Sequence, residues 1–351
     1  MVLTLTSLSA SQASATEQGC TPGDGVLSVS DLAEGTSVLE CDAIGRIVRH
    51  GGVGVTVPQP GNAVSVNAIL TGGVETGFTL EVAPDGTVSY DLSEASVDAS
   101  TAGSDIPDDL SDTKVTGDDL TEEGDTVEAD APDNSSVGEA EVADVDSLRA
   151  AGACSDSTYK TADRKEYGTY NWYIGDGGLP GGMSKNTALW TFYEALDNIT
   201  ESNNNCGMSD QVDVNTANFL DYTKYEADIN TNSDCTDRDG LSTWDGGNLK
   251  NGVVATTCSW TWSTPGVKND LREADVRFNT HDENFTNKPT SSCSDRYDIR
   301  SVGTHEAGHI FGLKDLGPGH ENLTMFGSSD PCTTKYRSLG KGDVLGLRSI
   351  Y

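Results

Sequence analysis

Apolar and polar positions alternate along much of the first hundred residues. The alternating runs are TSVLECDAIGRIVRH (36–50), GVGVTVPQP (52–60), AVSVNAIL (63–70), GFTLEVA (77–83) and GTVSYDL (86–92). Gly, Pro and Asp-Gly turns separate these runs, and a period of two is typical of strands that bury one face. The pattern predicts a small β-rich N-terminal domain, possessing no catalytic motif, over residues 16–104.

The alternation stops in the next segment, residues 105–150. Residues 105–146 contain sixteen Asp or Glu and one Lys, with few apolar residues and no periodicity. Such a segment buries too little apolar surface to fold, and its like charges repel one another. We expect an acidic, disordered linker here.

Strand and helix patterns are mixed in the last part of the chain, residues 151–351. The strand-like runs are NWYIG (171–175), GVVATTCSWTW (252–262) and EADVRFN (273–279). Two longer helices are expected, one capped by Ser184 and one from about Ile299 to Gly312 with Asp298 as its N-cap. GDVLGLRSIY closes the chain as a short helix. The predicted fold class is α+β.

The N-terminus and the cysteines both indicate export. Residues 1–15, MVLTLTSLSASQASA, look like the end of a secretory signal, although a disordered cytosolic N-terminus is the alternative. The eight cysteines contain no CxxC pair, so disulfides are favoured over a cysteine-bound metal. Cys20 and Cys41 precede the linker and can pair only with each other if each part pairs internally. We therefore expect a secreted protein.

The net charge of −34 limits the partners. An acidic chain of this kind is not attracted to nucleic acid or to anionic membranes. Solubility in an extracellular or salty medium explains the charge more simply than a specific cationic partner does.

The stretch HEAGHIFGLKD (305–315) carries the chemistry. On a helix, His305 and His309 project from the same face and can hold one zinc ion, while Glu306 lies beside the position of a zinc-bound water. Gly312 can end the helix in a left-handed conformation, so that the chain turns back and Asp315 reaches the metal. His320 is the rival third ligand, because imidazole is the commoner donor to zinc.

These residues resemble those of the metzincin zinc endopeptidases. HExxHxxGxxD followed by Met325 in LTMFG is similar to matrixin-like and snapalysin-like secreted bacterial proteases. The resemblance covers roughly residues 154–351 of the predicted peptidase domain 151–351, and it implies a twisted sheet, a long first helix, a zinc-binding helix, a methionine turn and a C-terminal helix. It also implies that 273–279 is an edge strand along which substrate lies. Phe326 departs from the tyrosine of many relatives, and no cysteine-switch motif precedes the domain.

The resulting prediction is a zinc metalloendopeptidase that acts on protein or peptide substrates. Glu306 takes a proton from the zinc-bound water and later returns it to the leaving amine. The alternatives are an extracellular binding module with a structural or degenerate metal site, and an enzyme acting on a non-peptide amide. Residues 237–240 (DRDG) hint at Ca²⁺ but fit a polar turn better. The N-terminal part is expected to be a pro-domain removed by cleavage near the linker, or else a permanent domain on a flexible tether.

Overall fold

The computed structural model describes residues 25–72, 76–92, 151–212 and 215–351. The expected signal segment 1–15 and the acidic linker 105–150 lie outside these ranges. Within the described ranges, no helix is long and apolar enough to cross a membrane.

One large mixed sheet organises the chain, with its strands in the order β6-β5-β4-β12-β13-β11-β8-β9 and with β7 also paired to β13. The strands are β4 (Asn62–Leu70), β5 (Thr76–Val82), β6 (Val88–Leu92), β7 (Arg164–Lys165), β8 (Thr169–Ile174), β9 (Thr216–Tyr222), β11 (Ser242–Gly247), β12 (Val253–Trp262) and β13 (Asn269–Asn279). Strands β9, β8, β11 and β13 run parallel to one another, whereas β12 is antiparallel to β13. Strands β4, β5 and β6 continue the sheet in antiparallel fashion beyond β12.

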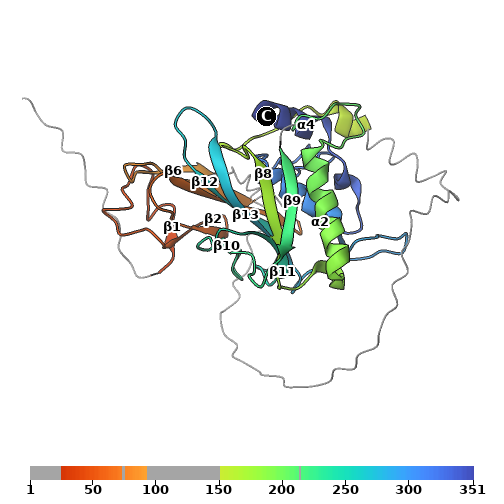
Figure 1. Cartoon of the computed structure of the whole chain (residues 1–351), viewed down its shortest axis with the longest axis horizontal. Helices are drawn as coiled ribbons and strands as arrows, with labels where there is room; N and C mark the ends of the chain where they lie inside the picture. Colours follow the sequence, from red (N-terminus) through yellow and green to blue (C-terminus); the bar gives the residue numbers. More distant parts are fainter. Residues whose placement is uncertain (1–24, 73–75, 93–150, 213–214) are drawn as a thin grey trace, which may run out of the picture.

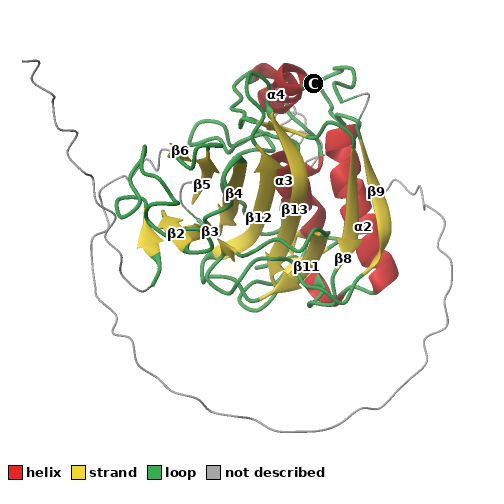
Figure 2. Cartoon of the chain, turned by 60° about the vertical axis from the view of Figure 1, so that its left-hand side comes forward, coloured by secondary structure: helices red, strands yellow, loops and turns green. Residues whose placement is uncertain are grey.

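Helices α2 (Lys185–Thr200) and α3 (Ile299–Ile310) pack against each other behind the sheet, as Figure 2 shows. The Ser184 side chain accepts a hydrogen bond from the Thr187 amide at 3.2 Å and caps α2 as predicted. Phe192, Leu196 and Ile199 are fully buried on its inner face. Helix α4 (Lys341–Ile350) closes the chain, and two 3₁₀ turns, η1 (Pro180–Gly182) and η2 (Lys335–Arg337), lie in the connections.

Two smaller sheets complete the structure. One contains β1 (Leu27–Ser28), β2 (Ile47–His50), β3 (Val53–Thr56) and β10 (Asp234–Cys235), and the other pairs β14 (Phe285–Thr286) with β15 (Tyr297–Asp298). The first of these joins N-terminal strands to a strand of the C-terminal part, because β3 pairs with β10. It packs against β4, and Val55, Val66 and Cys258 belong to the apolar cluster between them.

The α+β class is confirmed, whereas the expected position of strand 273–279 is wrong. Strand β13 is paired on both sides, with β11 and β12, so it is not an edge. The N-terminal run 63–70 forms a strand as predicted, but it joins the large sheet through β12 instead of a sheet confined to residues 16–104. Figure 1 shows these early strands beside β12. Spacing along the chain carries no information about which strand lies next to which.

Three disulfides lie entirely within the C-terminal part, in agreement with the prediction of disulfide bonding. They join Cys154 to Cys206, Cys235 to Cys258, and Cys293 to Cys332. Cys41 is also disulfide-bonded, and Cys20 lies outside the described residues.

Candidate metal centre

Helix α3 carries the predicted motif and is anchored firmly at its N-terminus. The buried Asp298 carboxylate accepts a hydrogen bond from the Ser301 amide at 2.8 Å, which is the predicted N-cap. Arg337 donates to both oxygens of the same carboxylate, at 2.8 and 2.5 Å. The charge of this buried cap is therefore compensated, and the start of the helix is fixed.

The two histidine rings point their Nε2 atoms at each other. His305 and His309 lie one helical turn apart, and their Nε2 atoms are 3.1 Å apart. The other ring nitrogen of each histidine lies within hydrogen-bonding distance of a backbone carbonyl oxygen. Nδ1 of His305 lies 2.8 Å from the Thr324 oxygen, and Nδ1 of His309 lies 3.1 Å from the Leu313 oxygen. When each Nδ1 donates its proton to its carbonyl, both Nε2 lone pairs face the same point, as metal-binding histidines require.

Gly312 makes the turn that brings Asp315 back to the helix. Its φ angle of +93° is the left-handed conformation expected from the sequence, and a Cβ at this position would lie 2.7 Å from the backbone oxygen of Arg164. After the turn, the Leu316 amide donates to the Met325 oxygen at 2.7 Å. The Asp315 carboxylate then lies 2.9 Å from His305 Nε2 and 3.3 Å from His309 Nε2.

Met325 packs against Gly308 of helix α3. A Cβ added to Gly308 would meet the Met325 sulfur at 2.3 Å, so only glycine allows this close packing. The turn itself is held by Asp343 of α4, whose carboxylate accepts hydrogen bonds from the amides of Thr324 at 2.9 Å and Met325 at 3.3 Å. The short last helix thereby positions the carbonyl of Thr324, which orients His305.

Glu306 is completely buried and is held by one strand residue. The Thr257 hydroxyl on β12 donates to Glu306 Oε2 at 2.5 Å, while Oε1 has no hydrogen-bond partner. Burial raises the pKa of Glu306 above its usual value. A carboxylate with a raised pKa and one free oxygen beside a metal site is suited to proton transfer.

Contacts among the three possible metal ligands shift the pKa values of His305 and Asp315. Burial acts to lower the pKa of His305, but the ion pair with Asp315 raises it to about 9. Burial acts to raise the pKa of Asp315, but the two imidazoles outweigh it and lower that pKa well below its usual range. Each of the four motif side chains is at most 1% exposed, so these interactions act with little solvent screening.

The residues present fit a zinc ion. His305, His309 and Asp315 each offer one donor atom, and these atoms all lie within 4.8 Å of one another. Oδ1 of Asp315 contacts only the two imidazoles, and its buried Oδ2 has no hydrogen-bond partner, a costly arrangement for a carboxylate unless a cation compensates it. Two imidazoles and one carboxylate form the three-ligand set of many catalytic zinc sites, which keep the fourth position open.

The structure places His320 outside this cluster. Its Nδ1 lies 2.7 Å from Asp156 Oδ2, and its side chain is 29% exposed. The Gly317-Pro318-Gly319 turn carries it away from α3, whereas Asp315 lies among the motif residues.

The DRDG segment forms part of a second acidic group. Asp239 lies with Asp228 and Glu273, each offering a carboxylate oxygen within the same small volume. Arg238 already supplies a cation there, with its Nε 3.3 Å from Glu273 Oε2. Because this group already contains a cationic side chain, no calcium site is assigned.

Three residues of the centre were missed from the sequence. Thr257 holds Glu306, Asp343 holds the methionine turn, and the Arg164 guanidinium donates to the His309 backbone oxygen at 2.8 Å through Nε. All three reach the motif from other elements, so no local spacing marks them. The strand-like run 252–262 could have suggested only that Thr257 lies in a strand.

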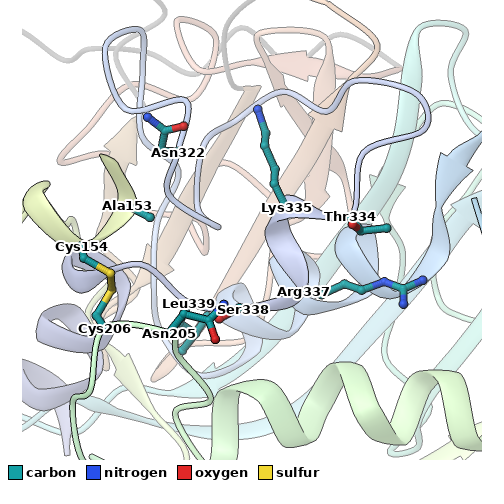
Figure 3. A pocket seen from close by; sticks show the side chains of 10 residues that line it. All are labelled: Ala153, Cys154, Asn205, Cys206, Asn322, Thr334, Lys335, Arg337, Ser338 and Leu339. Atoms are coloured by element: carbon teal, nitrogen blue, oxygen red, sulfur yellow. A yellow bond between two sulfur atoms is a disulfide. The ribbon is translucent and has the colours of Figure 1, made fainter. Parts of the chain in front are cut away.

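The hollow drawn in Figure 3 is separate from this centre. It lies beside the Cys154–Cys206 disulfide, and its other lining residues are Ala153, Asn205, Asn322, Thr334, Lys335, Arg337, Ser338 and Leu339. None of the motif side chains lines it, so we assign it no role in the chemistry.

No protein-family model matches the chain, and no curated protein sequence matches it.

Proposed function

We propose that this protein is a secreted, zinc-dependent endopeptidase. The observation that carries the proposal is the convergence of His305, His309 and Asp315 on one point, with the unpartnered oxygen of Glu306 beside them. The order of zinc helix, methionine turn and short last helix supports the resemblance to metzincin peptidases. Disulfides in the chain support export.

Each residue has a distinct part in the proposed hydrolysis. Zinc held by the three ligands would supply a Lewis acid that polarises a peptide carbonyl and acidifies water. Glu306 would take a proton from the attacking water at Oε1 and then deliver it to the leaving amine. Thr257 would keep Oε2 in place, so that the free oxygen faces the reacting atoms.

Glu306 also separates this proposal from the binding-module alternative. A structural metal site needs its ligands but has no use for a buried carboxylate that lacks a partner on one oxygen. Keeping such a group buried costs free energy, which is typical of a group retained for chemistry.

The test is hydrolysis of casein by the purified chain, both full-length and cut in the linker, with and without a zinc chelator. We expect one zinc per chain and cleavage that chelation abolishes and added zinc restores. If neither form shows chelator-sensitive cleavage while zinc is bound, the binding-module reading is favoured.

A further inference from the structure

Strand β4 of the N-terminal part occupies the outer edge of β12. Nine residues of β4 pair with it, from Asn62 opposite Trp262 to Leu70 opposite Val253. Without residues 62–70, β12 would expose unpaired backbone N–H and C=O groups, which can accept an extended peptide as an added strand. The edge nearest to Glu306 is thus already filled by this chain itself.

The register turns specific β4 side chains toward the metal centre. Asn67 lies opposite Thr257, and Ile69 lies opposite Ala255. Directly opposed residues of an antiparallel pair project from the same face of the sheet. Asn67 and Ile69 therefore share the face on which Thr257 contacts Glu306. Ile69 is 1% exposed and belongs to the apolar cluster that also contains Met325.

The end of β4 also contacts the chain that follows the methionine turn. The Leu70 carbonyl accepts from the Ser329 amide at 3.4 Å and from the Ser328 hydroxyl at 3.5 Å, just after the methionine turn. A further tie joins Lys314, next to the ligand Asp315, to Asp91 of β6 at 2.9 Å. Leu70 thus touches both β12 and the chain that follows Met325.

The motif residues of the metal centre are closed off from solvent. His305, Glu306, His309 and Asp315 are at most 1% exposed, yet hydrolysis of a protein requires access for an extended chain. From the proposed peptidase function, we infer that residues 62–70 lie in the place of the substrate strand and keep the enzyme latent. Activation then requires that β4 leave the edge of β12.

Spontaneous displacement of β4 from β12 is unfavourable because the opposite face of β4 is also packed. Val64, Val66 and Ala68 pack in the apolar cluster with Cys258 and Trp260 of β12. Removing β4 exposes that apolar surface, at roughly 25 cal/mol per Å². Cleavage of the chain between the N-terminal and C-terminal parts is therefore a more effective way to release β4. The three disulfides with both cysteines described all lie beyond residue 151, so none of them joins the two parts.

The test compares full-length, zinc-loaded chains by two measurements. Amide hydrogen exchange over residues 253–262 reports the pairing of β12, and hydrolysis of a short quenched-fluorescence peptide reports access. Ile69→Asp places a charge at the buried contact and is expected to raise both β12 exchange and hydrolysis, the latter at least tenfold. Leu92→Asp introduces the same charge at a position that is 39% exposed and should leave both measurements unchanged.

An engineered disulfide between β4 and β12, called the lock below, provides the reverse test. Ala68 lies opposite Thr256, so Ala68→Cys with Thr256→Cys can join β4 to β12 by a disulfide. Added to Ile69→Asp, this lock should return both readouts to the wild-type level. Should Ile69→Asp fail to fold, a wild-type chain cut at a protease site inserted in the linker replaces it, with and without the lock.

The outcomes are distinguishable. A wild-type uncut chain that hydrolyses the peptide as fast as the opened chains, or a locked chain that does so, would overturn latency. Faster β12 exchange in the opened chains without hydrolysis by any zinc-loaded form would instead overturn the peptidase proposal and leave strand displacement standing.

Discussion

The Thr257 hydroxyl lies 2.5 Å from Glu306 Oε2, so a residue of β12 holds the proposed general base of α3. The two residues are 49 positions apart in the chain. The same strand pairs with β4, in the place that we propose for a substrate strand, and holds the group that we propose would act on that substrate. In the proposed enzyme, substrate alignment and proton transfer would therefore depend on one element of the fold.

This contact predicts a positioning role for Thr257. Thr257→Val keeps the shape but removes the hydroxyl, and we expect kcat in the opened enzyme to fall about tenfold with zinc content unchanged. Thr257→Ser retains the hydroxyl and should restore most of kcat. Equal losses in the Val and Ser variants would show that packing at this position matters more than the hydrogen bond.

Glu306→Gln tests the chemistry directly. The amide preserves size but cannot accept the proton, so kcat should fall by about 10² to 10⁴ while one zinc per chain remains. Metal analysis and peptide hydrolysis on the opened enzyme measure the two effects. Retained turnover in this variant would contradict the assigned mechanism.

The ligand assignment is tested by a pair of alanine variants. Asp315→Ala removes a carboxylate in contact with both imidazoles and should lower zinc affinity by at least tenfold. His320→Ala removes a ring that pairs with Asp156 and should retain one zinc per chain. Titration with a competing zinc indicator gives both affinities. The reverse pattern would make His320 the ligand.

Gly312 and Gly319 have similar positive φ angles, so alanine variants of the two can distinguish backbone strain from a steric clash of the added Cβ. Gly312 has φ of +93° and a Cβ there would lie 2.7 Å from the Arg164 oxygen, whereas Gly319 has φ of +95° and open space around it. Gly319→Ala should cost about 1 kcal/mol of unfolding free energy. Gly312→Ala should cost about 3 kcal/mol or more and weaken zinc binding, because the turn to Asp315 must move. Urea denaturation with matched metal loading compares them.

Glu273 predicts a pH dependence away from the metal centre. Burial raises its pKa to about 7, so the folded state holds the proton more tightly than an unfolded chain, in which glutamate titrates near about 4.3. The unfolding free energy of the wild type therefore falls as pH rises from about 4.3 to about 7, and this contribution becomes constant at higher pH.

Glu273→Gln cannot ionise and escapes that loss. Relative to wild type, its unfolding free energy should increase by about 1 to 3 kcal/mol between about pH 4 and about pH 8. Glu40→Gln, the same substitution at an exposed position, is the matched control. A difference between Glu273→Gln and wild type that stays constant with pH would contradict the shifted titration.

Local features of the fold were readable from the sequence because they depend on residues close together in the chain. Ser184 and Asp298 cap their helices through amides three residues away, and Gly312 ends α3 because no side chain is tolerated there. The spacing of His305, Glu306 and His309 follows from one helical turn. The alternation of residues 63–70 predicts a strand but does not predict the strand with which it pairs.

Only the tertiary structure decided which elements meet. Strand β11 escaped prediction because its buried Asp245 reads as polar, and Arg277 neutralises it from β13 at 2.8 Å. The interior position of β13, the pairing of β4 with β12 and the reach of Thr257 to Glu306 all join distant residues. Those contacts are selected by the packing of whole surfaces, and the separation of residues along the chain does not encode them.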